Sequence, residues 1–292
     1  MRVMVKFSVL LLLFISNAVF ASQGPASNIQ KAYYGEKFYD QVLGKEHDND
    51  LKDALKKILK SGHIAVDGGF DQIVDRCGSL KNCVTHTAYG YDRARVFLFG
   101  KFYLVKLDAS NYGIKEMYCD RIYQKEDFKS GSQPGPGIVP SSTIINVEHT
   151  WPQSKFSGRY SKELQKSDMH HLFPTDSVMN ALRGNNIFGE VQQDQGSTKC
   201  SASRFGVGSA GPATIYEPPA DHKGHVARSL FYFSIRYDLP IRPEEEVVLK
   251  KWNHEHPVDA EELARNDEIA KLQGDRNPFI DHAELADDIA DF

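Results

Sequence analysis

The sequence predicts an α+β protein, in which mixed helices surround a small central sheet. Strand-like apolar segments occupy the middle of the chain, whereas helical periodicity dominates both flanks. Strands and helices do not alternate strictly along the chain, which argues against a doubly wound parallel sheet. No internal repeat is visible, so a solenoid or a propeller is not expected.

The first residues are typical of a secretory signal peptide. Arg2 and Lys6 precede or flank a short apolar run that extends from Phe7 to Ile15, and small residues follow up to Ala21. We expect cleavage after Ala21, so that residues 22–292 form a mature protein with a single domain. The alternative is an uncleaved membrane anchor, but the apolar run is short for a helix that crosses a bilayer.

The expected mature protein is acidic. Loss of Arg2 and Lys6 leaves 33 basic and 39 acidic residues, a net charge of −6. Such a protein is not a general binder of polyanions. If it binds nucleic acid, its basic groups must gather on one face and metal ions must help to neutralise phosphate. We expect a secreted or periplasmic monomer that does not contact a membrane after cleavage.

Two elements are predicted before residue 106. Apolar residues from Leu51 to Leu59 recur at helical spacing, with Asp50 as the expected N-cap and Gly62 as the stop. In the segment VFLFGKFYLV, residues 96–105, a Gly-Lys pair separates two apolar runs. This pattern predicts a tight β-hairpin in a buried sheet.

Four cysteines remain after export, and an even number suits an oxidising compartment: Cys77, Cys83, Cys119 and Cys200. Of the three possible pairings we favour Cys77 with Cys83 and Cys119 with Cys200. The alternative is that all four are buried free thiols. Their spacing lacks the paired C-x-x-C of zinc sites, so a zinc cluster is not expected.

A loop and a strand precede the most informative segment. Residues 131–140, GSQPGPGIVP, read as a surface loop within one domain. Residues 142–149 then alternate as a strand does, so Glu148 and His149 point to opposite faces. They could flank a phosphodiester, with Glu148 directed to a metal ion and His149 to a water molecule. Alone, each is more often a solvated or structural residue.

A second polar cluster follows in SDMHHLFPTD and SVMNALRGNN. It contains Asp168 and two histidines, His170 and His171, which we place at alternating strand positions. Thr175 is the expected cap of a short helix that stops at Gly184. On that helix one face carries an amide and a guanidinium, those of Asn180 and Arg183. These groups suit a magnesium ligand beside a phosphate clamp, although either could be a plain surface residue.

The C-terminal part is predicted to be helical. Apolar residues from Val226 to Phe233 line one face after a Pro-Pro pair, and a later helix from Ala260 to Leu272 ends at Gly274. We expect three basic side chains either to line a phosphate-binding groove or to decorate helix faces: Lys223, Arg228 and Arg276. A buried supporting role is an equal alternative for Arg228. The motif HEHP, residues 254–257, fits a solvated helix end better than a metal site.

Four long blocks, in order, resemble the bacterial endonuclease I family of secreted nucleases. They are NVEHTWPQSKF, DMHHLFPTDSVMNALRGNNIFGEV, YEPPADHKGHVARSLFYFSIRY and NHEHPVDAEELARNDEIAKLQGDRNPFIDH, and they span roughly residues 140–282. Upstream, residues 32–63 are similar to the opening helices of the family, though less specifically. The resemblance implies a ββα-metal (His-Me finger) motif at about residues 142–184.

The resemblance also implies roles for single residues. Glu148 and Asn180 correspond to the two protein ligands of one Mg²⁺ ion, with other divalent cations as possible substitutes, and His149 corresponds to the general base. Members of the family cut DNA, and often RNA, with little sequence preference and leave 5′-phosphate ends. Such tolerance is what contacts to the phosphate backbone predict.

This chain departs from some members of the family in one respect. In those members an arginine that steadies the cleaved phosphate lies in a longer, cysteine-bearing insertion, whereas residues 157–167 here are short and lack cysteine. We expect Arg159 or Arg183 to supply this charge. The family's disulfides do not transfer. Two alternative functions stay open: a zinc phosphoesterase that uses His149, His170 and His171, and a non-catalytic nucleic-acid-binding module on a nuclease scaffold.

Overall fold

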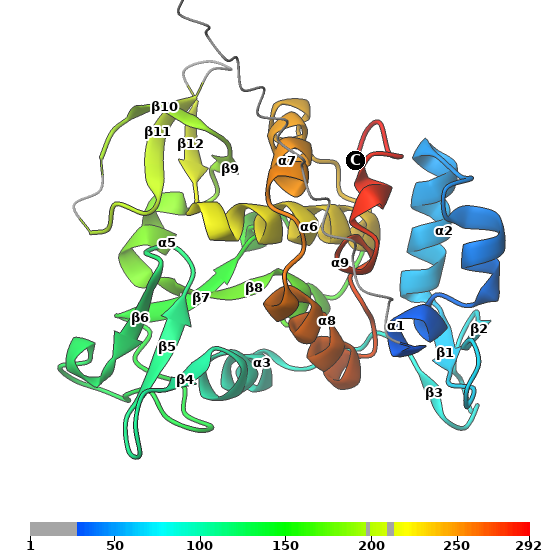
Figure 1. Cartoon of the computed structure of the whole chain (residues 1–292), viewed down its shortest axis with the longest axis horizontal. Coiled ribbons are helices and arrows are strands. Elements are labelled where there is room, and N and C mark those ends of the chain that lie inside the picture. Colours follow the sequence, from blue (N-terminus) through cyan, green and yellow to red (C-terminus); the bar gives the residue numbers. More distant parts are fainter. Residues whose placement is uncertain (1–27, 197–198, 209–212) are drawn as a thin grey trace, which may run out of the picture.

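The structure is a computed structural model that describes residues 28–196, 199–208 and 213–292. One long helix, α6 (Ala220–Tyr237), runs through the middle of the molecule (Figure 1). The sheets that contain β4–β6 and β9–β12 lie toward one end of α6, whereas the N-terminal helices and the small sheet of β1–β3 lie toward the other. This arrangement of helices and separate small sheets is the predicted α+β class. The predicted signal peptide, residues 1–21, lies outside the described residues.

The N-terminal part confirms the first predicted helix. It contains α1 (Asn28–Tyr33), a π-helical turn (Phe38–Val42), α2 (Asp48–Lys60), and an antiparallel sheet of order β2-β1-β3 built from Gly62–Ile64 (β1), Gln72–Val74 (β2) and Cys83–Val84 (β3). Helix α2 buries Leu51, Leu55 and Leu59 and packs on α6. Its N-cap is His47, not Asp50. Asp50 instead lies in the first turn, where a negative charge complements the helix dipole.

The hairpin predicted for residues 96–105 is wrong. This segment continues α3 (Tyr91–Phe97) into a π-helical stretch (Leu98–Phe102). The next strand, β4 (Leu104–Lys106), starts only afterwards. A Cβ on Gly100 would lie 2.7 Å from the Cα of Gly137, so the glycine permits close contact between two backbones and does not make a turn. The flanking apolar residues are buried on several sides, and such a run has no period that separates helix from strand.

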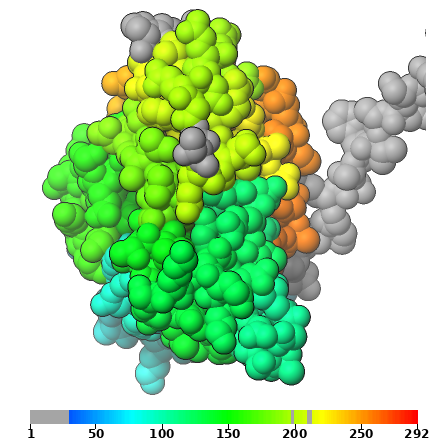
Figure 2. Space-filling view, turned by 90° about the vertical axis from the view of Figure 1, so that its left-hand side faces the viewer, coloured from blue at the N-terminus to red at the C-terminus, as the bar shows by residue number. Residues whose placement is uncertain are grey.

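Two sheets share one face of the molecule. One has the order β4-β5-β6 and includes Tyr112–Glu116 (β5) and Arg121–Gln124 (β6); the other has the order β10-β11-β12-β9 and consists of Ile187–Phe188 (β9), Val191–Asp194 (β10), Arg204–Gly208 (β11) and Thr214–Glu217 (β12). Figure 2 shows the second sheet directly above the first on this face. All pairings are antiparallel except that of β12 with β9.

A two-stranded sheet and a short helix lie between these layers. Strand β7 (Ile145–His149) pairs antiparallel with β8 (Leu172–Asp176), and α5 (Ser177–Arg183) follows β8 without a linker. The strand and the helix agree with the sequence prediction. The N-cap of α5 is Asp176, one residue after the predicted Thr175. The Oδ1 atom of Asp176 accepts hydrogen bonds from two backbone amides at 2.9 and 3.0 Å.

The predicted strand positions of His170 and His171 are also wrong. Both histidines lie in a 3₁₀ turn (Met169–His171) that precedes β8, after a short helix α4 (Lys162–Lys166). The side chain of Asp168 caps this turn by accepting a hydrogen bond from the amide of His170 at 3.1 Å. The local cap thus outweighs the alternation that suggested a strand.

The C-terminal helices match their predicted positions. Almost every residue of α6 from His222 onward is buried, and α7 (Pro243–Glu255) and α9 (Pro278–Asp281) pack on it together with α2. Helix α8 (Ala260–Gln273) packs against α9. Gly274 ends α8 with a positive φ of 89°. Within the described residues, no helix is both long and apolar enough to cross a bilayer.

Two disulfides join segments of the chain in the favoured pairing. Cys77 is bonded to Cys83, and Cys119 in the β5–β6 turn is bonded to Cys200 before β11. No free cysteine remains among the described residues. Residues 131–140 form neither helix nor strand and are mostly exposed, in agreement with the predicted surface loop.

Candidate active site

Glu148 is buried at the junction of β7 and α5. Its carboxylate is 2% exposed, and its Oε1 accepts a hydrogen bond of 2.7 Å from Nη1 of Arg183 in the last turn of α5. The same guanidinium donates to the carbonyl oxygens of His149 at 3.0 Å and of Thr150 at 2.6 Å. Arg183 therefore fixes α5 against the end of β7 and holds the Glu148 carboxylate in one place.

The surroundings of Glu148 make its ionisation sensitive to a nearby cation. Burial raises the pKa of Glu148 to about 7, while the Arg183 charge and the Tyr118 hydroxyl oppose that rise. A divalent cation bound to the carboxylate would favour its charged form further.

Asn180 lies on the same side of β7 as Glu148. Its Nδ2 donates to Oδ1 of Asn146 at 2.8 Å and to the carbonyl of Val147 at 3.2 Å. Asn146 and Glu148 are two residues apart on the strand and so share a face. Within the described part of the chain, no donor contacts Oδ1 of Asn180. A carboxylate and an amide oxygen thus stand on one side of the β7–α5 unit, a donor pair that fits a hard cation such as Mg²⁺.

His149 occupies the opposite face of β7, as the alternation predicts. Its Nε2 lies 3.1 Å from the carbonyl oxygen of Lys166. Because a carbonyl can only accept, Nε2 carries the hydrogen, and Nδ1 is left as the acceptor. The Nδ1 atom faces Nε2 of Gln153 at 3.4 Å. Burial, followed by the neighbouring His171, holds the pKa of His149 well below its usual value, so the ring is neutral at pH 7.

The second histidine pair is structural. His170 Nε2 lies 3.2 Å from the carbonyl oxygen of Asp275, and His171 Nε2 lies 2.9 Å from that of Gln165. Both rings are fully buried. Among the described residues, one group of three or more histidine, cysteine or acidic side chains could hold a metal ion, and it includes neither of these rings nor His149. The three-histidine zinc site is therefore not formed.

The predicted phosphate-binding cations do not form one surface. Arg228 and Arg276 are 0% and 1% exposed, and their guanidinium groups are hydrogen-bonded to the carboxylates of Glu262 and Asp281. Because buried, carboxylate-paired guanidiniums cannot reach a phosphate, their assignment as groove residues is wrong. Of the alternatives for Arg228, the buried supporting role is the one that the structure shows.

Two further predicted cations lie in different places. Arg159 is exposed and lines a cavity of about 410 Å³ between α2 and the C-terminal end of α6, away from the β7–α5 unit. Lys223 donates to Glu217 at 2.6 Å and lies over the ring of Trp252. At the HEHP motif, His254 is exposed and pairs with Asp287 at 2.9 Å, which agrees with a solvated helix end.

The sequence did not point to the β5–β6 turn, which contributes to the site. Glu116 at the end of β5 accepts hydrogen bonds of 2.7 Å from the amides of Tyr118 and Cys119, and one of 2.6 Å from the amide of Asp176. It thereby joins this turn to the start of α5 and places Tyr118 beside Glu148. No local pattern marks Glu116 or Tyr118, whereas Asn146 could have been found from its spacing to Glu148.

Comparisons with known proteins assign the sequence to a family. The model of the Endonuclease I family matches residues 78–284. An extracellular ribonuclease of Bacillus subtilis (strain 168) is 38% identical over 162 residues, which cover 49% of this chain and 53% of that protein. A periplasmic deoxyribonuclease of Aeromonas hydrophila is 29% identical over 168 residues, which cover 56% and 69%.

A third relative carries the family's own name. Endonuclease-1 of Buchnera aphidicola (subsp. Acyrthosiphon pisum, strain APS) is 26% identical over 115 residues, which cover 39% of this chain and 44% of that protein. The chain spans about half the length of the curated Bacillus relatives that it matches. The family match covers more than half of the chain and includes β7, β8 and α5. The chain belongs to the endonuclease I family.

Proposed function

We propose that this protein is an exported, Mg²⁺-dependent endonuclease that hydrolyses phosphodiester bonds of DNA and RNA with little sequence preference. The observation that carries the proposal is the placement of Glu148 and Asn180 on one face of β7 with a neutral His149 on the other. The relatives named as an extracellular ribonuclease and a periplasmic deoxyribonuclease support a nucleic-acid substrate of either kind.

Two residues would hold the metal ion in this proposal. The Glu148 carboxylate and Oδ1 of Asn180 would be its protein ligands, and Arg183 orients the carboxylate and favours its charged form against the effect of burial. When bound, the ion supplies positive charge that stabilises the phosphate oxygens and the leaving oxygen. We assign Arg183 this positioning role, because its guanidinium is buried and already bonded to three acceptors.

His149 acts as the general base. The Lys166 carbonyl keeps the hydrogen on Nε2 and fixes the ring, so Nδ1 accepts a proton from water. The resulting hydroxide attacks phosphorus, the bond from phosphorus to the 3′ oxygen breaks, and that oxygen takes a proton from solvent. The products are a 5′-phosphate and a 3′-hydroxyl end. The Lys166 carbonyl also stabilises the imidazolium that forms.

Export is part of the proposal. Two disulfides suit an oxidising compartment, and relatives are named extracellular and periplasmic. The proposed mechanism needs contacts to phosphates only, and such contacts carry no direct sequence information. A non-catalytic module is the less supported alternative, because a decayed site would have no reason to retain the buried pair of Glu148 with Arg183 and the ordered His149 ring.

The proposal is tested with the purified mature chain on supercoiled plasmid DNA and on single-stranded RNA. We expect degradation with Mg²⁺, arrest by EDTA, and recovery when excess Mg²⁺ is added back. End labelling should find 5′-phosphates. Intact plasmid and RNA across a screen of divalent cations and pH values would contradict the proposal.

A further inference from the structure

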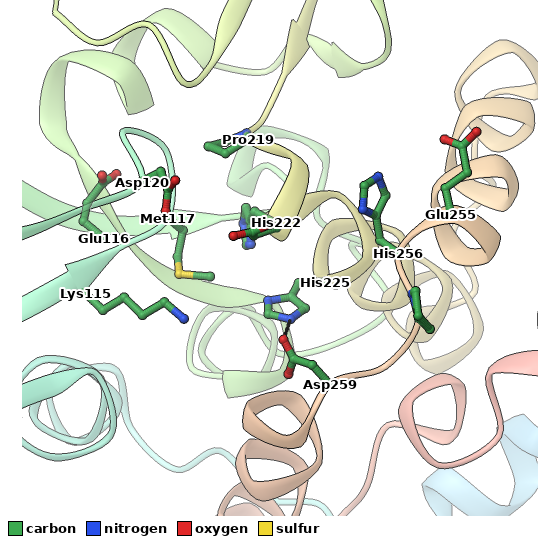
Figure 3. A pocket seen from close by; sticks show the side chains of 12 residues that line it. Lys115, Glu116, Met117, Asp120, Pro219, His222, His225, Glu255, His256 and Asp259 are labelled. Carbon is green, nitrogen blue, oxygen red and sulfur yellow. Dashed lines mark ion pairs between the residues drawn. The ribbon is translucent and has the colours of Figure 1, made fainter. Parts of the chain in front are cut away.

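A second cavity lies beside the β5–β6 turn and the start of α6. It measures about 280 Å³ and is bordered by the end of β5, the first turn of α6, and the connection from α7 to α8. Three histidines line it, together with several carboxylates (Figure 3). The proposed nuclease mechanism uses none of these three histidines.

Three potential ligand atoms converge beside this cavity, and two of the three residues, His225 and Asp259, line it. Nε2 of His225 lies 3.5 Å from Oδ2 of Asp259 and 3.7 Å from Oε2 of Glu262, and the ligand atoms of the three residues all lie within 4.8 Å of one another. Hydrogen bonds between imidazole and carboxylate span about 2.7–3.2 Å, so these separations are too long for good ones. They are close to the distance of about 3.4 Å between two ligands of a tetrahedral zinc ion.

A fourth candidate ligand, the imidazole of His222, lines the same cavity and has unmet hydrogen-bonding capacity. His222 is 1% exposed, and neither of its ring nitrogens has a hydrogen-bond partner among the described residues. It lies three residues before His225, so both rings occupy one face of α6. Their centroids are 5.7 Å apart, near the roughly 5 Å expected for two imidazoles on one zinc ion. A buried, unpartnered imidazole is costly unless something binds it.

Hydrogen bonds from neighbouring residues hold both carboxylates of this group. Glu262 receives two hydrogen bonds from Arg228, at 2.8 and 2.6 Å, which fix its carboxylate. Asp259 caps α8 through Oδ1, which accepts from the amide of Glu262 at 2.7 Å, and this leaves Oδ2 directed at His225. Lys115 also lines the cavity, but its ammonium is bound by both carboxylate oxygens of Glu261.

We propose that His225, Asp259 and Glu262, with His222 as the fourth ligand, form a binding site for Zn²⁺ or a similar first-row transition-metal ion, separate from the nuclease site. Imidazole ligands favour such ions, whereas Mg²⁺ prefers a shell of oxygen atoms. The ion would tie the first turn of α6 to the start of α8. The site is structural, because Glu262 and both histidines are buried and only Asp259 is exposed to solvent.

The experiment uses the full mature chain with Glu148→Gln, which disables the other site. After exposure to Zn²⁺ and dialysis, we expect one retained equivalent by elemental analysis and a Tm that rises with Zn²⁺ but not with Mg²⁺. His225→Ala and Asp259→Asn should lose both the retained zinc and the Tm shift. The asparagine can still cap α8, so this second variant separates ligand loss from misfolding.

The matched control is His254→Ala, which removes an exposed histidine at the end of α7 and should keep the zinc equivalent. In a chain that keeps Glu148, His225→Ala should cleave plasmid with Mg²⁺ at the rate of the unsubstituted protein. The proposal is overturned if the Glu148→Gln chain retains no zinc. It is also overturned if His225→Ala and Asp259→Asn, each made in that chain, retain the same zinc equivalent. If the unsubstituted protein does not cleave plasmid, the nuclease proposal is contradicted instead, and the zinc measurement stays valid.

Discussion

At the scale of single residues, the site is governed by two ionisable groups on opposite faces of one strand. Burial pushes the pKa of Glu148 up and that of His149 down. Both shifts favour neutral forms, but the proposed mechanism needs a neutral imidazole and a charged carboxylate. The neutral imidazole is ready to accept a proton, whereas the carboxylate must be charged to hold a cation.

A pH dependence follows from this difference. Because the pKa of Glu148 is about 7, the carboxylate is protonated below that pH, and we expect kcat/KM to rise between about pH 6 and 8 and then level off. Raising the Mg²⁺ concentration should move the rise to lower pH, since the cation favours the charged carboxylate. Rate profiles at two Mg²⁺ concentrations check this. A profile that falls with rising pH, or one that Mg²⁺ leaves unmoved, would contradict the account.

At the scale of elements, one side chain holds α5 on β7. Arg183 connects the helix to a carboxylate and two carbonyls of the strand end. Arg228 is an equally buried arginine elsewhere, bonded to Glu262 and Asn253. The two form a matched pair, because one lies in the proposed site and the other does not.

Arg183→Lys should therefore differ from Arg228→Lys in function but not in stability. Each change replaces a buried guanidinium with an ammonium and so loses several hydrogen bonds. Each should therefore lower the free energy of unfolding by about 1–3 kcal/mol. Only Arg183→Lys should also weaken Mg²⁺ activation of cleavage. Urea unfolding and Mg²⁺ titrations of activity measure the two effects. Equal Mg²⁺ dependence in both variants would remove Arg183 from the site.

The β5–β6 turn is held by a single acceptor. The Glu116 carboxylate accepts hydrogen bonds from three backbone amides. The change Glu116→Gln would direct an NH₂ group at one of these donors. We expect Glu116→Gln to lower the free energy of unfolding by about 1–3 kcal/mol and to reduce activity, because Tyr118 loses its support beside Glu148. Chemical unfolding and plasmid cleavage provide the measurement. An unchanged stability would show that Glu116 does not fix this turn.

The sequence predicted local elements well, but it did not reveal contacts between residues that lie far apart in the chain. Regular periodicity found α2 and the later helices, and the compact motif around Glu148 brought together three residues that the structure also places at one junction. A wholly apolar run hid the helical nature of residues 96–102, since it has no polar face. Tyr118 and Glu116 stayed invisible, because their partners lie 30 to 60 residues away and only tertiary packing joins them.

At the scale of the whole molecule, the two disulfides close loops of very different size. Cys77–Cys83 spans 6 residues and Cys119–Cys200 spans 81. In the chain-entropy model, the long loop stabilises the fold by about 4.5 kcal/mol and the short one by about 2 kcal/mol. Replacing each pair with serine and measuring unfolding in guanidinium should give this order. A larger loss from the short loop would contradict it.

The central claim is that His149 is the base of a metal-dependent nuclease, and His149→Ala tests it most directly. We predict that the variant cleaves plasmid roughly 10²–10⁴-fold more slowly with saturating Mg²⁺. Its Tm and its affinity for labelled duplex DNA should stay close to those of the parent and of the control His254→Ala. Cleavage by His149→Ala at the parent rate would contradict the account.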